Sequence, residues 1–262
     1  MNTKIYRLRE FIDPIDGKSL IIDTSAGLSL GPLPGLEHFM DAVQPVLPMI
    51  DGLVTSPGQS RKFVERTRQD AALLVRADWT NALRGPEFVL PPETILHHPI
   101  ISPREGIELG VSALVIYFLL GHEEEIEAGC LKTTVQYALQ GSEIGIPLIV
   151  DVQPIGPRVV MMDKAIELGV SYALEGGADG IAIPWPGKRS FMTIRTMAAD
   201  VPIWIKPSST TVLETVLTEA LAQGATGVWL DENLFAQPDA LALLNNIARL
   251  IHPTIITEDV RR

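Results

Sequence analysis

Residues 202–231 read PIWIKPSSTTVLETVLTEALAQGATGVWLD and contain a complete strand–helix–strand unit. The runs Pro202–Lys206 and Gly227–Leu230 are nearly continuously apolar, which is typical of parallel strands covered on both faces. Between them, Thr211–Gln223 has the 3.6-residue period of an amphipathic helix. Gly224 follows that helix where the left-handed backbone of a C-cap is common. The stretch therefore predicts a βαβ unit of a parallel sheet.

The same alternation repeats through most of the chain. Glycine-containing phrases precede two more predicted strands, ELGVSA at 108–113 and EGGADG at 175–180. The further predicted strands are Ser19–Asp23, Gly52–Thr55, Ala72–Arg76, Ala113–Phe118, Pro147–Val152 and Gly180–Ile183. The further predicted helices are Gly35–Val46, Gln59–Arg68, Gly121–Leu139, Val159–Gly176, Gly187–Ala199 and Asn233–Ile251.

Eight βα units within about 250 residues predict a fold of the α/β class, a single (β/α)8 TIM barrel that spans residues 1–262. A doubly wound open sheet is the alternative. It usually carries a G-x-G-x-x-G loop after its first strand, and the sequence has none.

Two stretches interrupt the regular pattern. Residues 1–18 form a preface, which we expect to close the bottom of the barrel with a small helix or strand. Residues 77–103 hold five prolines and predict a long loop over the barrel mouth. His97 and His98 lie in that loop, and we expect a surface pair because adjacent side chains point in different directions.

Bulk properties exclude several classes of partner. The formal net charge of −11 argues against nucleic acid and anionic membranes, which both need a basic face. The N-terminus has no signal-peptide pattern, and no apolar run reaches the roughly 18 residues of a membrane span, so we expect a soluble cytoplasmic protein. A hydrophobic content of 46% leaves apolar surface for a subunit interface, and predicts a homo-oligomer. The single cysteine, Cys130, excludes an internal disulfide and a cysteine-built zinc site, and predicts a buried packing thiol.

Lys206 is the strongest candidate for chemistry. It ends an apolar strand, and in a TIM barrel the carboxyl ends of the strands form the active site. A lysine with an apolar stem can lose its proton there and act as an amine nucleophile. The alternative is an ion pair with a neighbouring carboxylate at the mouth. The other lysines fit solvated charges in helices, loops or the terminus: Lys4, Lys18, Lys62, Lys132, Lys164 and Lys188.

An imine mechanism also needs an acid or base and a polar clamp, but no cofactor. Asp23 and Asp151 end two predicted strands and are the candidate acid/base residues, with structural pairing to Lys206 or Arg76 as the alternative. Arg76 is a candidate clamp for a carboxylate or phosphate. The other candidate substrate-binding residues are Asp78, Tyr117, Gln153, Trp185, Ser208 and Ser209.

Two further functions remain open. Asp23, Asp151, Asp231 and Glu232 all fall at predicted strand ends, where carboxylates could hold Mg²⁺ or Mn²⁺ and polarise a carbonyl. No histidine joins them, so no metal site is our first expectation. The third possibility is a non-catalytic barrel that binds a small molecule through its acidic mouth.

Several motifs resemble those of class I aldolases, the family that includes deoxyribose-phosphate aldolase and the archaeal-type fructose-bisphosphate aldolases. These motifs are IIDTSAGLSLGPLPGLE (21–37), GADGI (177–181), IKPSSTT (205–211) and GATGVWLDENLF (224–235). The resemblance covers about residues 18–250. It implies a (β/α)8 barrel that forms a lysine Schiff base with a small carbonyl substrate.

The departures from this family are informative. Ala182 stands where the strand-six lysine should fall, and Gln153 stands near the place of a proton-handling tyrosine. Asp231-Glu232 and Ser208-Ser209 replace the glycine-rich cradle for a sugar phosphate, and two carboxylates would repel phosphate. Lys206 matches a second lysine of deoxyribose-phosphate aldolase, on strand seven. The sequence therefore predicts a divergent aldolase-like lyase with a Schiff base on Lys206, not standard fructose-bisphosphate cleavage.

Overall fold

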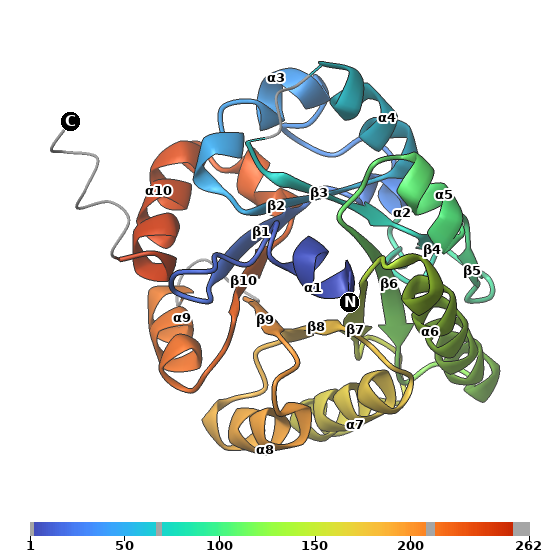
Figure 1. The fold of residues 1–262 in the computed structure, drawn as a ribbon. Coiled ribbons are helices and arrows are strands. Elements are labelled where there is room, and N and C mark those ends of the chain that lie inside the picture. The colour runs from blue at the N-terminus through green and yellow to red at the C-terminus, as the bar shows by residue number, and fades with distance from the viewer. Residues whose placement is uncertain (1–2, 67–69, 208–212, 254–262) are drawn as a thin grey trace, which may run out of the picture.

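The computed structural model of the chain describes residues 3–66, 70–207 and 213–253. Within them, eight parallel strands close into a barrel in the order β1-β10-β9-β8-β7-β6-β3-β2 (Figure 1). The strands are β1 (Ser19–Asp23), β2 (Gly52–Thr55), β3 (Ala72–Arg76), β6 (Ala113–Leu119), β7 (Leu148–Gln153), β8 (Gly180–Pro184), β9 (Ile203–Lys206) and β10 (Gly227–Leu230). The predicted single (β/α)8 barrel is confirmed, with each strand boundary within one residue of its expected place.

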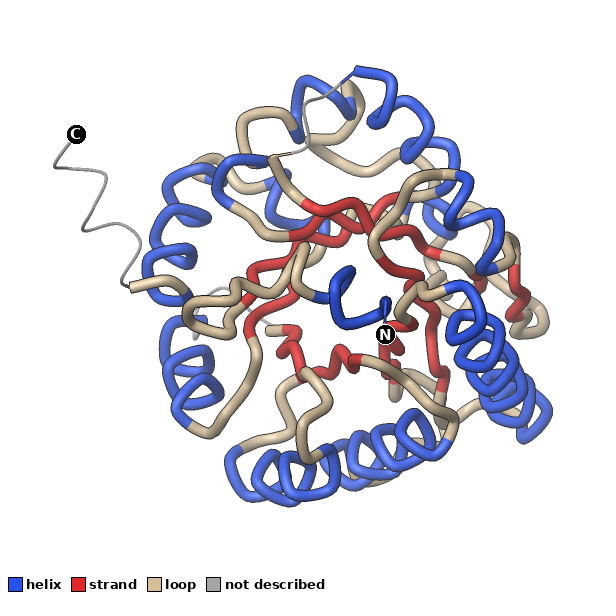
Figure 2. The backbone as a smooth tube through the Cα atoms, in the orientation of Figure 1, coloured by secondary structure: helices blue, strands red, loops and turns tan. Residues whose placement is uncertain are grey.

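Helices form a ring around the strands (Figure 2). They are α3 (Phe39–Val43), α4 (Pro57–Arg66), α5 (Pro103–Glu108), α6 (Glu124–Ile144), α7 (Met162–Glu175), α8 (Lys188–Ala198), α9 (Leu213–Ala222) and α10 (Ala240–Ile251). Short helical turns α2 (Gly27–Leu30), η1 (Leu47–Met49) and η3 (Glu232–Ala236) follow or precede the strands. Searched over the described residues, no helix is both long enough and apolar enough to cross a membrane.

Local backbone chemistry explains where the helices differ from the prediction. The helix expected from Gly35 begins only at Phe39, because Gly35 has a φ of +79° and cannot belong to a right-handed helix. The helix expected over 233–251 is divided into η3 and α10, and Pro238 lies between them. Helix α5 was not predicted, although Ser102 and Glu105 form a capping box and Pro103 occupies the first turn.

Strand alternation separates two apolar cores. One core fills the space between barrel and helices, and the other lies inside the barrel. The inner core contains Ile21, Leu74, Ile149, Trp204 and Trp229. Because side chains alternate along a strand, the residues two positions further on also face the interior, now at the carboxyl end.

The preface lies across the opposite opening of the barrel. Helix α1 (Thr3–Leu8) is seen over the centre of the strand ring (Figure 1). The ring of Phe11 packs 5.9 Å from that of Trp204 and contributes to the inner core. Lys4, expected as a solvated charge, is instead buried, and its Nζ lies 2.7 Å from Asp179 Oδ2 before β8. The amino-terminal end is therefore closed, which leaves the carboxyl end as the place for a ligand.

The segment 77–103 contains a small hairpin of its own. Strands β4 (Asp78–Thr80) and β5 (His97–Pro99) pair in antiparallel fashion outside the barrel sheet. Trp79 Nε1 donates a hydrogen bond of 2.9 Å to the carbonyl of Leu28, which ties the hairpin to α2.

Candidate active site

A buried ionic network lies at the carboxyl end of the barrel, directly above the inner core. Arg76, at the end of β3, is its centre and is only 1% exposed. Its Nη2 lies 2.6 Å from Asp23 Oδ2 on β1 and 3.0 Å from Asp151 Oδ2 on β7. The guanidinium carbon also lies 3.6 Å from the ring centroid of Tyr117 on β6, within cation–π distance. Arg76 therefore holds two buried carboxylates, where the sequence suggested a clamp for a substrate anion.

Asp23 is held by several donors at once. The backbone N–H and the hydroxyl of Ser25 donate to its Oδ1, at 2.8 and 2.5 Å. Arg76 and Trp229 Nε1 donate to its Oδ2, the latter at 3.2 Å. Burial alone would raise the pKa of Asp23, but Arg76, Lys206 and the Ser25 hydrogen bonds hold this pKa below its usual value. Asp23 is therefore a carboxylate under working conditions.

Lys206 meets the same network from β9. Its Nζ donates to both oxygens of Asp151, at 2.8 and 2.9 Å. Gln153 Nε2 donates to Asp151 Oδ1 at 2.9 Å. Asp151 is fully buried, whereas the Lys206 side chain is 19% exposed, so the ammonium lies between the buried network and the open mouth.

A pocket of about 270 Å³ opens above the network. It is lined by Asp23, Ala26, Leu30, Leu83, Tyr117, Gln153, Lys206, Asp231 and Glu232. The structure thus brings Asp23, Arg76, Asp151 and Lys206 together, with Lys206 and Asp23 reaching the pocket. Tyr117 and Gln153 line it as expected. Ser208 and Ser209 lie outside the described residues.

Two predicted substrate contacts lie elsewhere. Trp185 does not line the pocket, because its ring packs 5.4 Å from that of Phe191 of α8, beside the outer core. Asp78 is fully buried, accepts the Tyr117 backbone N–H at 2.6 Å and contacts His97. The sequence shows only that both residues follow a strand end, and this position does not tell whether a side chain points toward the pocket or away from it.

The expectation of a surface pair at His97 and His98 is wrong for His97. The His97 side chain is 3% exposed, and its Nε2 lies 2.6 Å from Asp78 Oδ2. Its Nδ1 lies 3.3 Å from Cys130 Sγ of α6, so the buried thiol has a polar contact as well as a packing role. Burial alone would lower the pKa of His97, but the bonds to Asp78 and Cys130 raise it to about 10. The His97–Asp78 pair lies within the β4–β5 hairpin. The contacts of Asp78 with the Tyr117 N–H and of His97 with Cys130 fasten this hairpin to β6 and α6.

Glu232 follows β10 and faces the pocket. Burial, together with the neighbouring charges of Asp231 and Asp23, raises the pKa of Glu232 to about 7, although Lys206 and its own backbone hydrogen bond act in the opposite direction. The sequence placed Glu232 at a strand end only as a possible metal ligand and as a replacement for a phosphate cradle.

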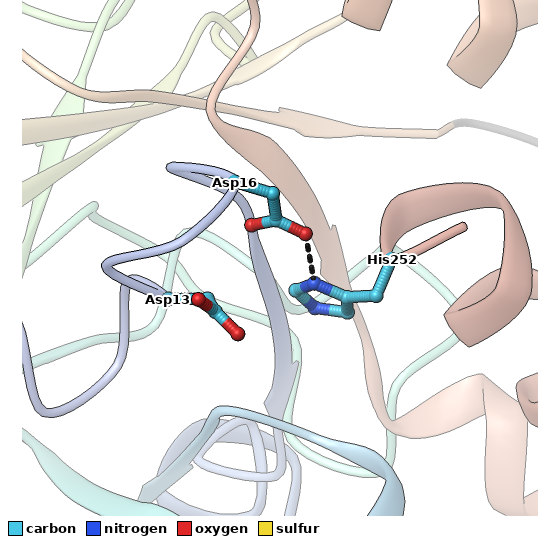
Figure 3. Close-up of side chains that lie close together, drawn as sticks. All are labelled: Asp13, Asp16 and His252. Carbon is cyan, nitrogen blue, oxygen red and sulfur yellow. Dashed lines mark hydrogen bonds and ion pairs between the residues drawn. The ribbon is translucent and has the colours of Figure 1, made fainter. Parts of the chain in front are cut away.

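The four mouth carboxylates do not fit a shared metal ion. Asp23 and Asp151 already bind Arg76 and Lys206, two cations that occupy the oxygens a metal would need. Among the described residues, the group whose ligand atoms lie close enough for an ion is Asp13, Asp16 and His252 (Figure 3). This group lies near the amino-terminal end of the barrel, away from the pocket.

His252 explains that group without a metal. Its Nδ1 lies 2.8 Å from Asp16 Oδ2 and its Nε2 lies 3.0 Å from Asp51 Oδ2. Burial alone would lower the pKa of His252, but these two carboxylates raise it to about 9. A protonated imidazole has no lone pair for a metal. Through its two ion pairs, His252 links the end of α10 to the segments that precede β1 and β2.

Comparison with curated proteins gives aldolases and related enzymes. The chain is 27% identical over 248 residues to an uncharacterized aldolase of Saccharolobus solfataricus, covering 90% of each chain. It is 24% identical over 249 residues to 2-amino-3,7-dideoxy-D-threo-hept-6-ulosonate synthase 1 of Archaeoglobus fulgidus, covering 94% of this chain and 90% of that one. It is 25% identical over 250 residues to 3-hydroxy-5-phosphonooxypentane-2,4-dione thiolase of Escherichia coli, covering 94% and 81%. No protein-family model matches the sequence.

Solved structures agree on the fold. An archaeal fructose 1,6-bisphosphate aldolase superimposes with a TM-score of 0.78 at 22% identity, covering 96% of this chain and all of that one. The fructose-bisphosphate aldolase of Slackia heliotrinireducens gives a TM-score of 0.77 at 16% identity, covering 98% and 88%. Aldolases appear in both comparisons, so the resemblance seen in the sequence motifs is confirmed.

Proposed function

We propose that this protein is an aldolase-type carbon–carbon lyase that forms a Schiff base between Lys206 and a small carbonyl substrate. The observation that carries the proposal is the position of Lys206 Nζ: it lines the mouth pocket and is held by both oxygens of Asp151. A covalent imine needs an amine fixed at the substrate and a base beside it, and the network supplies both.

Asp151 and Asp23 are the proposed acid/base residues for imine formation. Asp151 is the better placed because it contacts Nζ and can receive a proton from the ammonium. Nζ then attacks the carbonyl carbon, and a proton moves from the nitrogen to the former carbonyl oxygen to give the carbinolamine. Asp151 returns its proton to that hydroxyl, which leaves as water, and the iminium forms. Arg76 positions the two carboxylates from below. Tyr117 and Gln153 are proposed substrate contacts because they line the pocket.

Reductive trapping tests this proposal directly. Purified protein is treated with sodium borohydride in the presence of a panel of small aldehydes, ketones and keto acids, and its intact mass is measured. We expect one covalent adduct per chain, located by peptide mapping at Lys206. Absence of an adduct with every carbonyl of the panel would contradict the Schiff base.

The acidic mouth predicts a substrate without a phosphate group at this end. Asp231 and Glu232 line the pocket, at the place where the resemblance to class I aldolases implies a glycine and an arginine for phosphate, and carboxylates repel phosphate. We expect the turnover number for fructose 1,6-bisphosphate to lie at least about a hundredfold below the range of roughly 1–10³ s⁻¹ that is typical of metabolic enzymes. A coupled assay for triose phosphate measures this, and turnover within that range would show that the role given to the β10 end is wrong.

A non-catalytic barrel is the second candidate, and the Lys206–Asp151 contact favours it as well. An ion pair of this geometry is what a purely structural lysine would form. In that case the pocket would bind a small molecule without forming a covalent adduct. Thermal shift with the same carbonyl panel, read beside the trapping experiment, separates binding from imine formation.

We also propose that the chain forms a homo-oligomer through its outer helices. Leu131, Val135 and Leu139 lie one turn apart on α6 and are 36%, 37% and 64% exposed. Light scattering at micromolar concentration should give a mass of at least twice the 28.6 kDa chain. The variant Leu139→Glu should shift the equilibrium toward the monomer, because it places a charge in an apolar row. A wild-type monomer at ordinary salt concentrations would contradict the proposal.

A further inference from the structure

Imine formation is only half of a lyase reaction, and the second half needs a base that faces the substrate. A proton must leave a hydroxyl or a carbon of the bound substrate and must later return. Asp23 is a poor choice, because four donors already occupy its two oxygens. Asp151 is fully buried and is bound by Arg76, Lys206 and Gln153. The donors around Asp23 stabilise it as an anion, which makes it a weak base, and Asp151 is committed to the lysine nitrogen.

Glu232 is placed differently from these two carboxylates. It follows β10 at the start of η3, lines the same pocket as Lys206 and is half-buried. Within the part of the chain that the structure describes, its side chain forms no ion pair. The charged groups that act on it are Asp231 of its own segment, Asp23 from β1 and Lys206 from β9.

Asp231, the carboxylate next to Glu232 in the chain, is less suitable as the base. It is exposed, and its Oδ1 accepts the backbone N–H of Asn233 at 3.1 Å as the N-cap of η3. Its carboxylate is thus engaged in holding the turn that presents Glu232 to the pocket.

We propose that Glu232 is a catalytic acid/base that moves the substrate's proton on the Lys206 imine. This inference rests on the Schiff base proposed above and assigns to the pocket a second residue that contacts the substrate. The two proton transfers are thereby divided: Asp151 serves the lysine nitrogen, and Glu232 serves the substrate.

The cleavage step balances with these groups. The Glu232 carboxylate takes the proton of the substrate hydroxyl that lies β to the iminium carbon. The carbon–carbon bond breaks, its electron pair moves toward the iminium nitrogen, and an aldehyde and an enamine result. Glu232, now protonated, returns the proton to the enamine carbon, which restores the iminium. Water then adds, Lys206 is released, and the second carbonyl product leaves.

The environment of Glu232 suits both directions of this transfer. Because burial and the nearby Asp231 and Asp23 raise its pKa to about 7, the carboxyl group is present in both forms near neutral pH. Abstraction of a proton needs the carboxylate, so the rate of the abstraction step should rise with pH through about 7.

Hydrogen exchange on an unphosphorylated ketone tests the proposal. Wild type, Glu232→Gln and the matched control Asp239→Asn are incubated with hydroxyacetone in D₂O, and loss of the α-hydrogen signal is followed by NMR across pH. Asp239 is an exposed carboxylate in the same segment, and it does not line the pocket. We expect Glu232→Gln to exchange about 10²–10⁴-fold more slowly, the range for loss of a general base, and to lose the rise through pH 7. Asp239→Asn should exchange like wild type, and borohydride trapping on Lys206 should be equal in all three.

The outcomes separate the two proposals. Failure of wild type to be trapped by hydroxyacetone or any other member of the carbonyl panel counts against the Schiff base itself. Normal trapping with exchange in Glu232→Gln within twofold of wild type would overturn the role of Glu232 alone. An equal loss of exchange in Asp231→Asn would also overturn it, because the effect would then follow mouth charge and not one carboxyl group. Glu232→Asp should recover part of the exchange and the pH dependence.

Discussion

Replacing Lys206 with arginine should abolish both carbon–carbon cleavage and borohydride trapping while the protein stays folded. Arginine keeps the positive charge beside Asp151, so the buried network retains its ionic balance. Its guanidinium stays protonated and cannot form an imine. We expect activity to fall by about 10⁴-fold or more, the size seen when a covalent nucleophile is removed. Lys206→Ala should give the same loss of activity and trapping.

Steady-state kinetics on the substrate found by trapping, with intact mass spectrometry, measures this effect. Lys132→Arg is the matched control, because Lys132 is exposed on α6 and far from the pocket. Circular dichroism verifies that each variant is folded. An active Lys206→Arg variant would show that the lysine serves only as a charge partner, and the binding function would then be preferred.

Replacing Arg76 with methionine should destabilise the barrel by about 3–5 kcal/mol, as expected when one partner of a buried ionic network is removed. Methionine fills most of the space but leaves Asp23 and Asp151 buried together, with Lys206 as their remaining cation. Urea denaturation at neutral pH measures the loss in the free energy of unfolding. Arg189→Met is the control, because Arg189 is exposed at the start of α8 and should change stability by less than about 0.5 kcal/mol.

The pH dependence of this loss follows from the lowered pKa of Asp23. A carboxyl group with a folded-state pKa below its unfolded value adds stability above the unfolded pKa, near 3.9, and loses that contribution as pH falls through the folded pKa. In Arg76→Met the main cause of the lowering is gone. The gap between wild type and variant should therefore be largest at neutral pH and narrow below about pH 4. A gap that does not change with pH would contradict the ionic explanation and point to packing alone.

The sequence predicts the barrel and the centre of its site for the same reason. The apolar runs locate the strands, and the period of two then places Asp23, Arg76, Asp151 and Lys206 on the inner face above Ile21, Leu74, Ile149 and Trp204. Once eight such strands close into a barrel, these four side chains must meet at its carboxyl end. The sequence does not predict which of them form ion pairs, because the distances between the side chains depend on the stagger between strands.

Residues in loops were harder to predict. Trp185 leaves its strand through Pro184 and turns to Phe191, which no periodic pattern describes. His97 is fixed by Asp78 across a hairpin nineteen residues away along the chain, and by Cys130 of α6. The pattern Ser102-Pro-Arg-Glu105 was a readable capping signal for α5, and the proline-rich surroundings concealed it.

The ionic network under the pocket has a consequence for the energy of the proposed reaction cycle. Arg76 and Lys206 carry two positive charges, and Asp23 and Asp151 carry two negative ones. An iminium on Lys206 bears the same charge as the ammonium that it replaces. The buried dipoles and ions are therefore already oriented for the covalent intermediate, and the surroundings need little reorganisation when it forms. The balance of two positive and two negative charges changes only while Lys206 is a free amine, and at that stage its proton has moved no further than Asp151.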